Sequence, residues 1–179
     1  MGTPEVPLEH AHETIEHHAE HSSEPWVMGV ALTAAIVAAM AAVTALFAEH
    51  FATEATLEQI QASDTWSEFQ ANSIKEKVIL GNMKISQKLG IPVDAEDEKK
   101  LDDYKTNKEK VKKKAEDFEE ESKKHLAKHV PLSRGLTMFQ VAIAIGAISV
   151  LTKRRTYWFV AIGFGVIGVI FLATGFLIN

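Results

Sequence analysis

The first 25 residues carry the side chains best suited to chemistry: five His and six Glu, with no Lys or Arg. Imidazole nitrogens and carboxylate oxygens are ligands for zinc, nickel and copper. If the segment is helical, Glu13, His17 and His21 recur every four residues on one side, and His10 lies within reach. The spacing predicts a metal site formed by His10, Glu13, His17 and His21, which a second copy of the chain could complete.

A structural interpretation of the same segment stands beside the metal site. The residues that would form one apolar side of a helix here are Leu8, Ala11, Ile15, Ala19 and Ser22. On this interpretation, residues 1–25 form an acidic, His-rich amphipathic tail that makes contacts and binds no metal. A pH response is a third possibility, because the five His titrate near pH 6.5 beside six Glu.

The rest of the sequence favours a protein that is not an enzyme. The absence of Cys excludes thiolate nucleophiles, iron–sulfur clusters and Cys-type zinc sites. Gly163, Gly165 and Gly168 match the letters of a dinucleotide fingerprint, but no strand precedes them. The net charge of −5 makes nucleic acid an unsuitable partner.

The charges are distributed so unevenly that the chain reads as an all-α integral membrane protein. No charged residue lies between Glu24 and Glu49, between Arg134 and Lys153, or after Arg155. We expect transmembrane helices over 26–48, 135–152 and 156–179. A basic turn at 153–155 joins the second of these helices to the third. The first is a retained span, because a secretory signal needs a positive start. The predicted location is the bacterial inner membrane, crossed several times, with the lipid bilayer as partner.

Residues 49–134 are predicted to form a charged helical hairpin resembling a coiled-coil stalk. The first span should continue without a break as one helix from Trp26 to Leu89, about 95 Å long at ~1.5 Å per residue. Gly90 and Pro92 predict a turn at 90–93, and Asp94 should cap a return helix that ends near Pro131.

Apolar residues mark the faces along which these helices should pack. The return helix has a heptad seam at Leu101, Tyr104, Lys108, Val111, Ala115, Phe118, Ser122, His125 and His129. The outgoing helix has two apolar stripes: Ala62, Trp66, Phe69, Ser73, Leu80 and Met83, and then Ala71, Ile74, Val78, Ile85 and Leu89. A single hairpin covers only one of them, so the second stripe predicts another copy of the chain as partner.

Small residues at steps of three and four recur in all three spans. The first span has Ala34, Ala38, Ala41 and Ala45; the third has Ala161, Gly165, Gly168 and Gly175; the second has Ala142, Gly146 and Ser149. Small residues let helices approach closely in lipid, so these positions are candidate interfaces. The alternative is that Ala is simply common in membrane helices. A passive oligomeric pore would instead be lined by Thr33, Thr44, Thr137, Gln140 and Thr174.

A second group of His and Glu residues lies where the paired helices should reach the membrane surface. His125 and His129 lie four residues apart on the return seam, and His50, Glu49 and Glu54 lie on the opposing helix. The group could bind a metal, or it could form a polar layer that fixes the register of the two helices.

The run from Ala62 to Lys75 reads A-S-D-T-W-S-E-F-Q-A-N-S-I-K. It resembles the signature of an uncharacterised bacterial membrane family, domain of unknown function 4337, in which Lys usually stands at the position of Asn72. The His-rich start and the terminal pair of spans also look similar. The resemblance implies a bacterial protein with three spans, and it implies no activity, substrate or catalytic residue.

Within this signature, Trp66, Phe69 and Ser73 lie on one helix face beside Gln70. The four residues predict either a core layer of the hairpin or a docking surface. The sequence as a whole favours a self-associating scaffold, spacer or accessory subunit of a larger membrane protein complex. The alternatives are a metal-binding or metal-sensing accessory protein that uses the tail, and the passive pore.

Overall fold

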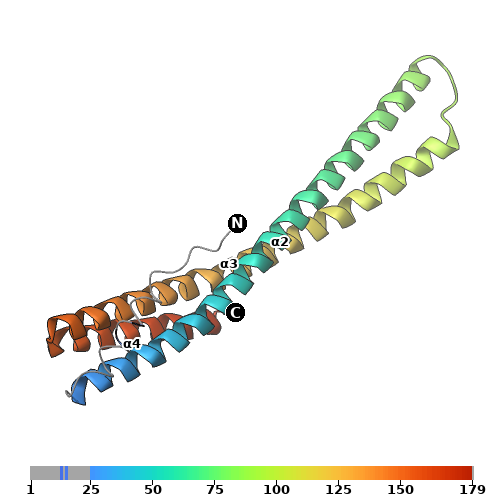
Figure 1. Ribbon diagram of the computed structural model, residues 1–179. Coiled ribbons are helices and arrows are strands. Elements are labelled where there is room, and N and C mark those ends of the chain that lie inside the picture. Colours follow the sequence, from blue (N-terminus) through green and yellow to red (C-terminus); the bar gives the residue numbers. More distant parts are fainter. Residues whose placement is uncertain (1–12, 14, 16–24, 179) are drawn as a thin grey trace. The chain divides into compact units, whose positions relative to one another are not determined.

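A computed structural model describes residues 13, 15 and 25–178, and these residues are almost entirely helical (Figure 1). Three long helices follow one another: α2 (Pro25–Lys88), α3 (Ala95–Thr152) and α4 (Arg155–Leu177). The described residues contain no strand, so the all-helical prediction is confirmed for this part of the chain.

Helix α2 ends one residue before the predicted Leu89, and glycine supplies the stop. Gly90 has a φ of 69°, a left-handed conformation that glycine adopts without steric cost. The backbone N–H of Gly90 donates to the carbonyl of Gln87 at 3.2 Å, and that of Ile91 donates to Ser86 at 2.9 Å. This pair of bonds is a Schellman motif, which satisfies the carbonyls left free at a helix end.

Helix α3 begins where the acidic residues favour a start. The Asp94 Oδ1 accepts a hydrogen bond of 2.9 Å from the N–H of Glu96, and Glu96, Asp97 and Glu98 occupy the first turn. Negative charge at a helix N-terminus interacts favourably with the helix dipole.

The prediction that the return helix ends near Pro131 is wrong. Pro131 lies inside α3, which continues to Thr152, so the return helix and the expected span at 135–152 are one element. Proline removes only the bond to the carbonyl four residues earlier, at Ala127. The buried side of α3 keeps its three-and-four spacing across this point, through Ser122, His125, His129 and Leu132, and that packing favours a continuous helix.

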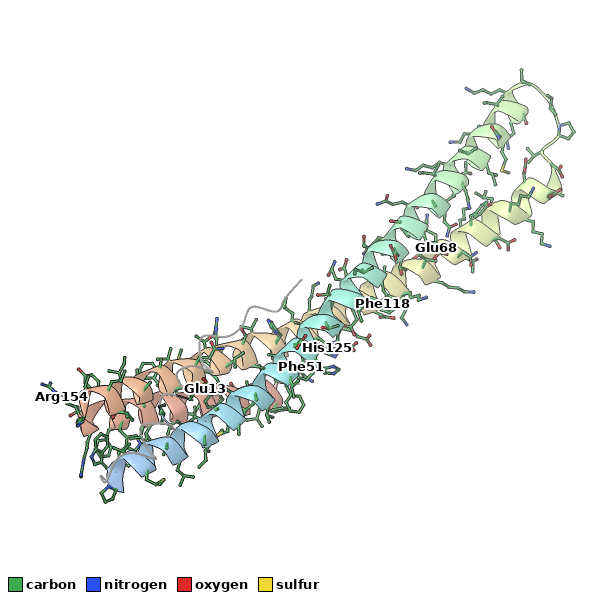
Figure 2. All side chains as sticks on the ribbon, viewed as in Figure 1. Glu13, Phe51, Glu68, Phe118, His125 and Arg154 are labelled. Atoms are coloured by element: carbon green, nitrogen blue, oxygen red, sulfur yellow. The ribbon has the colours of Figure 1, made fainter. Side chains whose placement is uncertain are left out.

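A two-residue turn of Lys153 and Arg154 joins α3 to α4, and Arg155 already belongs to α4. Lys153 has a φ of 51°, which is unusual for a residue with a side chain. The N–H of Arg154 donates to the carbonyl of Ser149 at 3.2 Å, and the hydroxyl of Ser149 donates to the carbonyl of Arg154 at 3.2 Å. Figure 2 shows Arg154 at this turn.

The chain divides into two compact units, and α2 and α3 contribute to both. The unit Thr53–His125 is a hairpin of two antiparallel helical stretches joined by the loop at 89–94. The other unit contains the residues up to Ala52 and from Leu126 onward, in which stretches of α2, α3 and α4 pack together. Each of the three helices contains a stretch long and apolar enough to cross a membrane.

Candidate functional site

The signature residues Trp66 and Phe69 lie on the side of α2 that faces α3. The indole N–H of Trp66 donates to the Glu119 Oε1 at 2.7 Å, and the Trp66 and Phe69 rings meet edge to face at 5.4 Å. Both side chains are half-buried, as is Ser73, whereas Gln70 is exposed. Trp66 and Phe69 therefore take part in the packing of the hairpin, and Gln70 lies at its outer edge.

Two polar residues of the signature are more deeply buried than the aromatic pair. Thr65 is 8% exposed, and its hydroxyl donates to the Gln61 carbonyl at 2.6 Å. Asn72 is 7% exposed, and no hydrogen bond joins its side-chain amide to another residue of the described chain. A buried amide of this kind costs stability, and in paired helices such a residue fixes register.

Polar bonds between the two helices run along the hairpin. The Lys108 Nζ lies 2.6 Å from the Glu76 Oε2, with both side chains largely buried. Near the other end, the His125 Nδ1 lies 2.9 Å from the Glu58 Oε2. The Ser122 hydroxyl donates to the Ala55 carbonyl at 2.8 Å. These bonds fix the register of α3 along α2, because each bond forms only when its two residues lie opposite each other.

The second His and Glu group does not assemble as a metal site. The Nδ1 of His125 contacts Glu58, which is outside the predicted group, and the Nδ1 of His129 contacts the Ala48 carbonyl at 2.9 Å. Across the residues that the structure describes, no three His, Cys, Asp or Glu side chains gather where they could hold a metal ion.

Of the tail's proposed ligands, only Glu13 falls among the described residues, and it is exposed. His10, His17 and His21 lie outside them. Ile15 is the other described residue of the tail, and its side chain is fully buried in an apolar cluster with Val27, Val30, Ala34, Ala147 and Val150.

The small residues of the spans pack against helices of the same chain. A Cβ added to Gly168 would lie 2.6 Å from a ring carbon of Phe139, and one added to Gly175 would lie 2.7 Å from the Leu132 Cγ. Gly165 and Ala161 are buried as well. In α2, the predicted interface residues are buried (Ala34, Ala41) or half-buried (Ala38, Ala45). The structure therefore uses these small side chains to bring α2, α3 and α4 together.

Four of the five polar residues considered for a pore form hydrogen bonds within their own helices. The hydroxyls of Thr33, Thr44, Thr137 and Thr174 each donate to a carbonyl three or four residues earlier. Thr33 also accepts a bond of 3.1 Å from the indole N–H of Trp158. A hollow of about 20 Å³ between the helices is lined mainly by apolar side chains. That volume suffices for about one water molecule.

The second apolar stripe of α2 remains uncovered. Ile74, Val78, Ile85 and Leu89 are 63%, 55%, 58% and 68% exposed, and Ala71 is exposed too. We call this surface the outer stripe. Figure 2 shows side chains projecting from the hairpin on the sides that its two helices turn away from each other. A run of large exposed apolar side chains on one helix face is the feature expected of an interaction surface.

The outward side of α3 carries charges that pair along the helix. Lys124 donates to Glu120 at 2.7 Å and so holds the pKa of that carboxyl below its ordinary value, while the pKa of Lys124 is raised by the same bond. Both side chains are well exposed, so the pair belongs to a solvated surface.

Comparison with known families reaches almost the whole described chain. The model of a domain of unknown function, DUF4337, matches residues 26–178. The chain belongs to the DUF4337 family. No curated protein and no solved structure matches it. The DUF4337 match includes both the signature around Trp66 and the outer stripe, and it brings no activity with it.

Sequence reasoning did not identify the partners of the signature residues. Glu119 stands 53 residues from Trp66, and Glu58 stands 67 residues from His125. The position of Glu119 in the sequence could have identified it as the partner of Trp66. Glu119 directly follows Phe118, a predicted seam residue, and an antiparallel pair that turns at 90–93 places Glu119 opposite Trp66.

Proposed function

We propose that this DUF4337 protein is a multi-pass membrane protein, located in the bacterial inner membrane, that self-associates as a scaffold or spacer within a larger membrane assembly. The observation that supports this proposal is the outer stripe: four large apolar side chains, each more than half exposed, on a helix whose opposite side is already occupied by α3. Water contact with such a surface is unfavourable, and a second helix would remove it.

The polar bonds of the hairpin are consistent with a structural role. Glu76 with Lys108, Glu58 with His125, and Trp66 with Glu119 all join one helix to the other. Bonds of this kind fix geometry, and a spacer needs a fixed geometry. The role that we propose is structural and non-enzymatic.

The proposal is tested by measuring the mass of the purified protein in detergent with size-exclusion chromatography and light scattering. The wild type is expected to elute as a homo-oligomer, and Val78→Glu is expected to shift it towards the monomer, because a carboxylate would be placed in the apolar contact. The matched control is Gln87→Glu, an exposed position on the same helix about 2.5 turns away, on the other side. A monomeric wild type would contradict the proposal.

A further inference from the structure

The hairpin stretch of α2 has two series of residues with three-and-four spacing, on opposite sides of the helix. The inner series faces α3 and is buried or half-buried throughout: Ala55, Glu58, Ala62, Thr65, Phe69, Asn72, Glu76, Ile79, Met83 and Ser86. The outer series contains the outer stripe except Leu89 and extends it towards the start of the hairpin: Leu57, Ile60, Asp64, Ser67, Ala71, Ile74, Val78, Gly81 and Ile85. All of the outer series is exposed except Gly81, which is half-buried.

The outer series has the spacing that a helix uses to pack along another helix over a long distance. Alternating steps of three and four keep the same side of a helix in contact with a neighbour turn after turn. Leu57 and Ile60 are 47% and 52% exposed, so the apolar character continues beyond the outer stripe. A scatter of exposed apolar residues would not repeat this register over 29 residues of one helix.

Gly81 gives an independent indication. It lies inside α2, where glycine destabilises a helix relative to alanine, and a Cβ added there would meet nothing within 4 Å. No contact among the described residues therefore requires a glycine at this position. A second helix that comes close to α2 at this point would account for the glycine.

The size of the surface reaches the lower limit for a specific contact between proteins. Leu57 to Leu89 spans 32 residues, or about 48 Å at ~1.5 Å per residue, and a helix is about 10 Å wide. The strip therefore covers roughly 500 Å² on each of two helices and roughly 1,000 Å² on the pair, the area at which specific interfaces begin.

The charges beside the outer series are compatible with a second copy in parallel orientation. In a parallel, in-register pair, the residue before each first core position faces the residue five places later in the partner. From Ala71 onward these facing pairs are Gln70 with Lys75, Lys77 with Asn82, and Lys84 with Leu89, so no two like charges face each other across this part of the contact. Copies inserted in one membrane with the same orientation would also present α2 in the same direction.

From these observations we infer that the outer series of α2 pairs with the outer series of a second copy, parallel and in register, so that Val78 lies opposite Val78 of the other copy. The inference rests on the proposed self-association, and it specifies the surface through which two copies meet and their parallel, in-register arrangement. Asp64 is the one acidic residue in the series and would meet its own copy. It would weaken the pair there and separate the Leu57–Ile60 contact from the longer contact that begins at Ala71.

Single cysteines test the inference cleanly, because the natural chain has none. Ile74→Cys, Val78→Cys and Ile85→Cys are made one at a time in the full-length protein in its own membrane, and each is oxidised mildly. Each is expected to give a disulfide-linked homodimer, because facing core positions come within disulfide distance. Gln87→Cys is the matched control on the other side of α2 and is expected to give at least about tenfold less dimer. All four positions are exposed, so the substitutions do not disturb the packing of the chain.

A second measurement uses Asp64. In the Val78→Cys background, Asp64→Leu is expected to increase the cross-linked fraction, because it removes two facing carboxylates and completes the apolar series. A decrease would place Asp64 in a favourable contact with a cationic partner and would overturn the pairing of like series.

The outcomes separate this inference from the proposed function. An oligomer by light scattering, with cysteines at the three core positions no more cross-linked than Gln87→Cys, would overturn the pairing and leave self-association standing through another surface. Cross-linking at Val78 without Ile74 and Ile85 would overturn the parallel register. Disulfide capture of a different protein at all three positions would overturn the second copy as partner. A monomeric wild type would overturn both.

Discussion

Replacing Gly168 by Ala should destabilise the packing of α4 against α3. The added Cβ would lie 2.6 and 2.7 Å from two ring carbons of Phe139 and 3.1 Å from a third. Phe139 is fully buried, so its ring cannot turn away into open space. Either the ring leaves its preferred rotamer or the helices move apart, and overpacking of this kind costs about 1–3 kcal/mol. A cost of about 2 kcal/mol corresponds to about a 30-fold change in the unfolding equilibrium constant.

The matched control for this prediction is Gly163→Ala in the same helix. Nothing lies within 4 Å of a Cβ at that position, so the substitution adds only the helix preference of Ala and should leave the protein equally or more stable. Stability is measured for the full chain in mixed micelles by titration with a denaturing detergent, with helix content followed by circular dichroism.

The double variant Gly168→Ala with Phe139→Leu tests the proposed cause. A smaller side chain at position 139 should restore part of the lost stability, giving a coupling energy between two residues in contact. If Gly168→Ala unfolds at the same detergent fraction as Gly163→Ala, the close packing of α3 and α4 that this reasoning assumes is wrong.

Three further predictions concern single bonds and one turn. Trp66→Phe should lower the free energy of unfolding by about 1 kcal/mol, because Glu119 loses its N–H donor; an unchanged denaturation midpoint would contradict this. Lys153→Gly should raise the thermal midpoint, since glycine avoids a left-handed strain of about 1–2 kcal/mol; a lower midpoint would show that the lysine side chain matters more. The pKa of Glu120 is lowered by Lys124, so their bond contributes above the ordinary value of 4.5 and is lost as the pH falls through the lowered pKa. Helix content should therefore decline slightly below pH 4.5, and Glu120→Gln should abolish that part of the decline.

The long helices could be predicted because their signals are local. Gly90 and Pro92 mark the loop between α2 and α3, and Asp94 with the acids after it marks the start of α3. These residues act through their own backbone conformation or through neighbours a few positions away. Sequence alone shows such interactions.

Pro131 shows where a local signal is misleading. A proline usually ends a helix, and the loss of one backbone bond favours that reading. The outcome depended on the packing of residues on both sides, since the buried positions of α3 keep one spacing from Ser122 to Leu132. To compare the cost of the lost backbone bond with the gain from continuous packing, one must know which helix packs against α3. The sequence alone does not show this.

For the candidate sites too, local features could be predicted from the sequence and contacts between distant residues could not. The two stripes of α2 followed from periodicity, and the structure places the Trp66 stripe towards α3 and the Val78 stripe outward. The bonds of Trp66 with Glu119 and of His125 with Glu58 depend on the relative register of two helices. Periodicity placed Ile15 on an apolar side of the tail, but the residues of α2 and α3 that bury it could not be identified from residues 1–25.

The most direct test of self-association is native mass spectrometry of the untagged protein released gently from its own membrane. The mass reports the copy number, any bound metal and any other protein in the same particle. We expect a homo-oligomer of fixed size that is lost in the Val78→Glu variant. A wild-type monomer, or one copy bound to a different protein, would contradict self-association through the outer stripe.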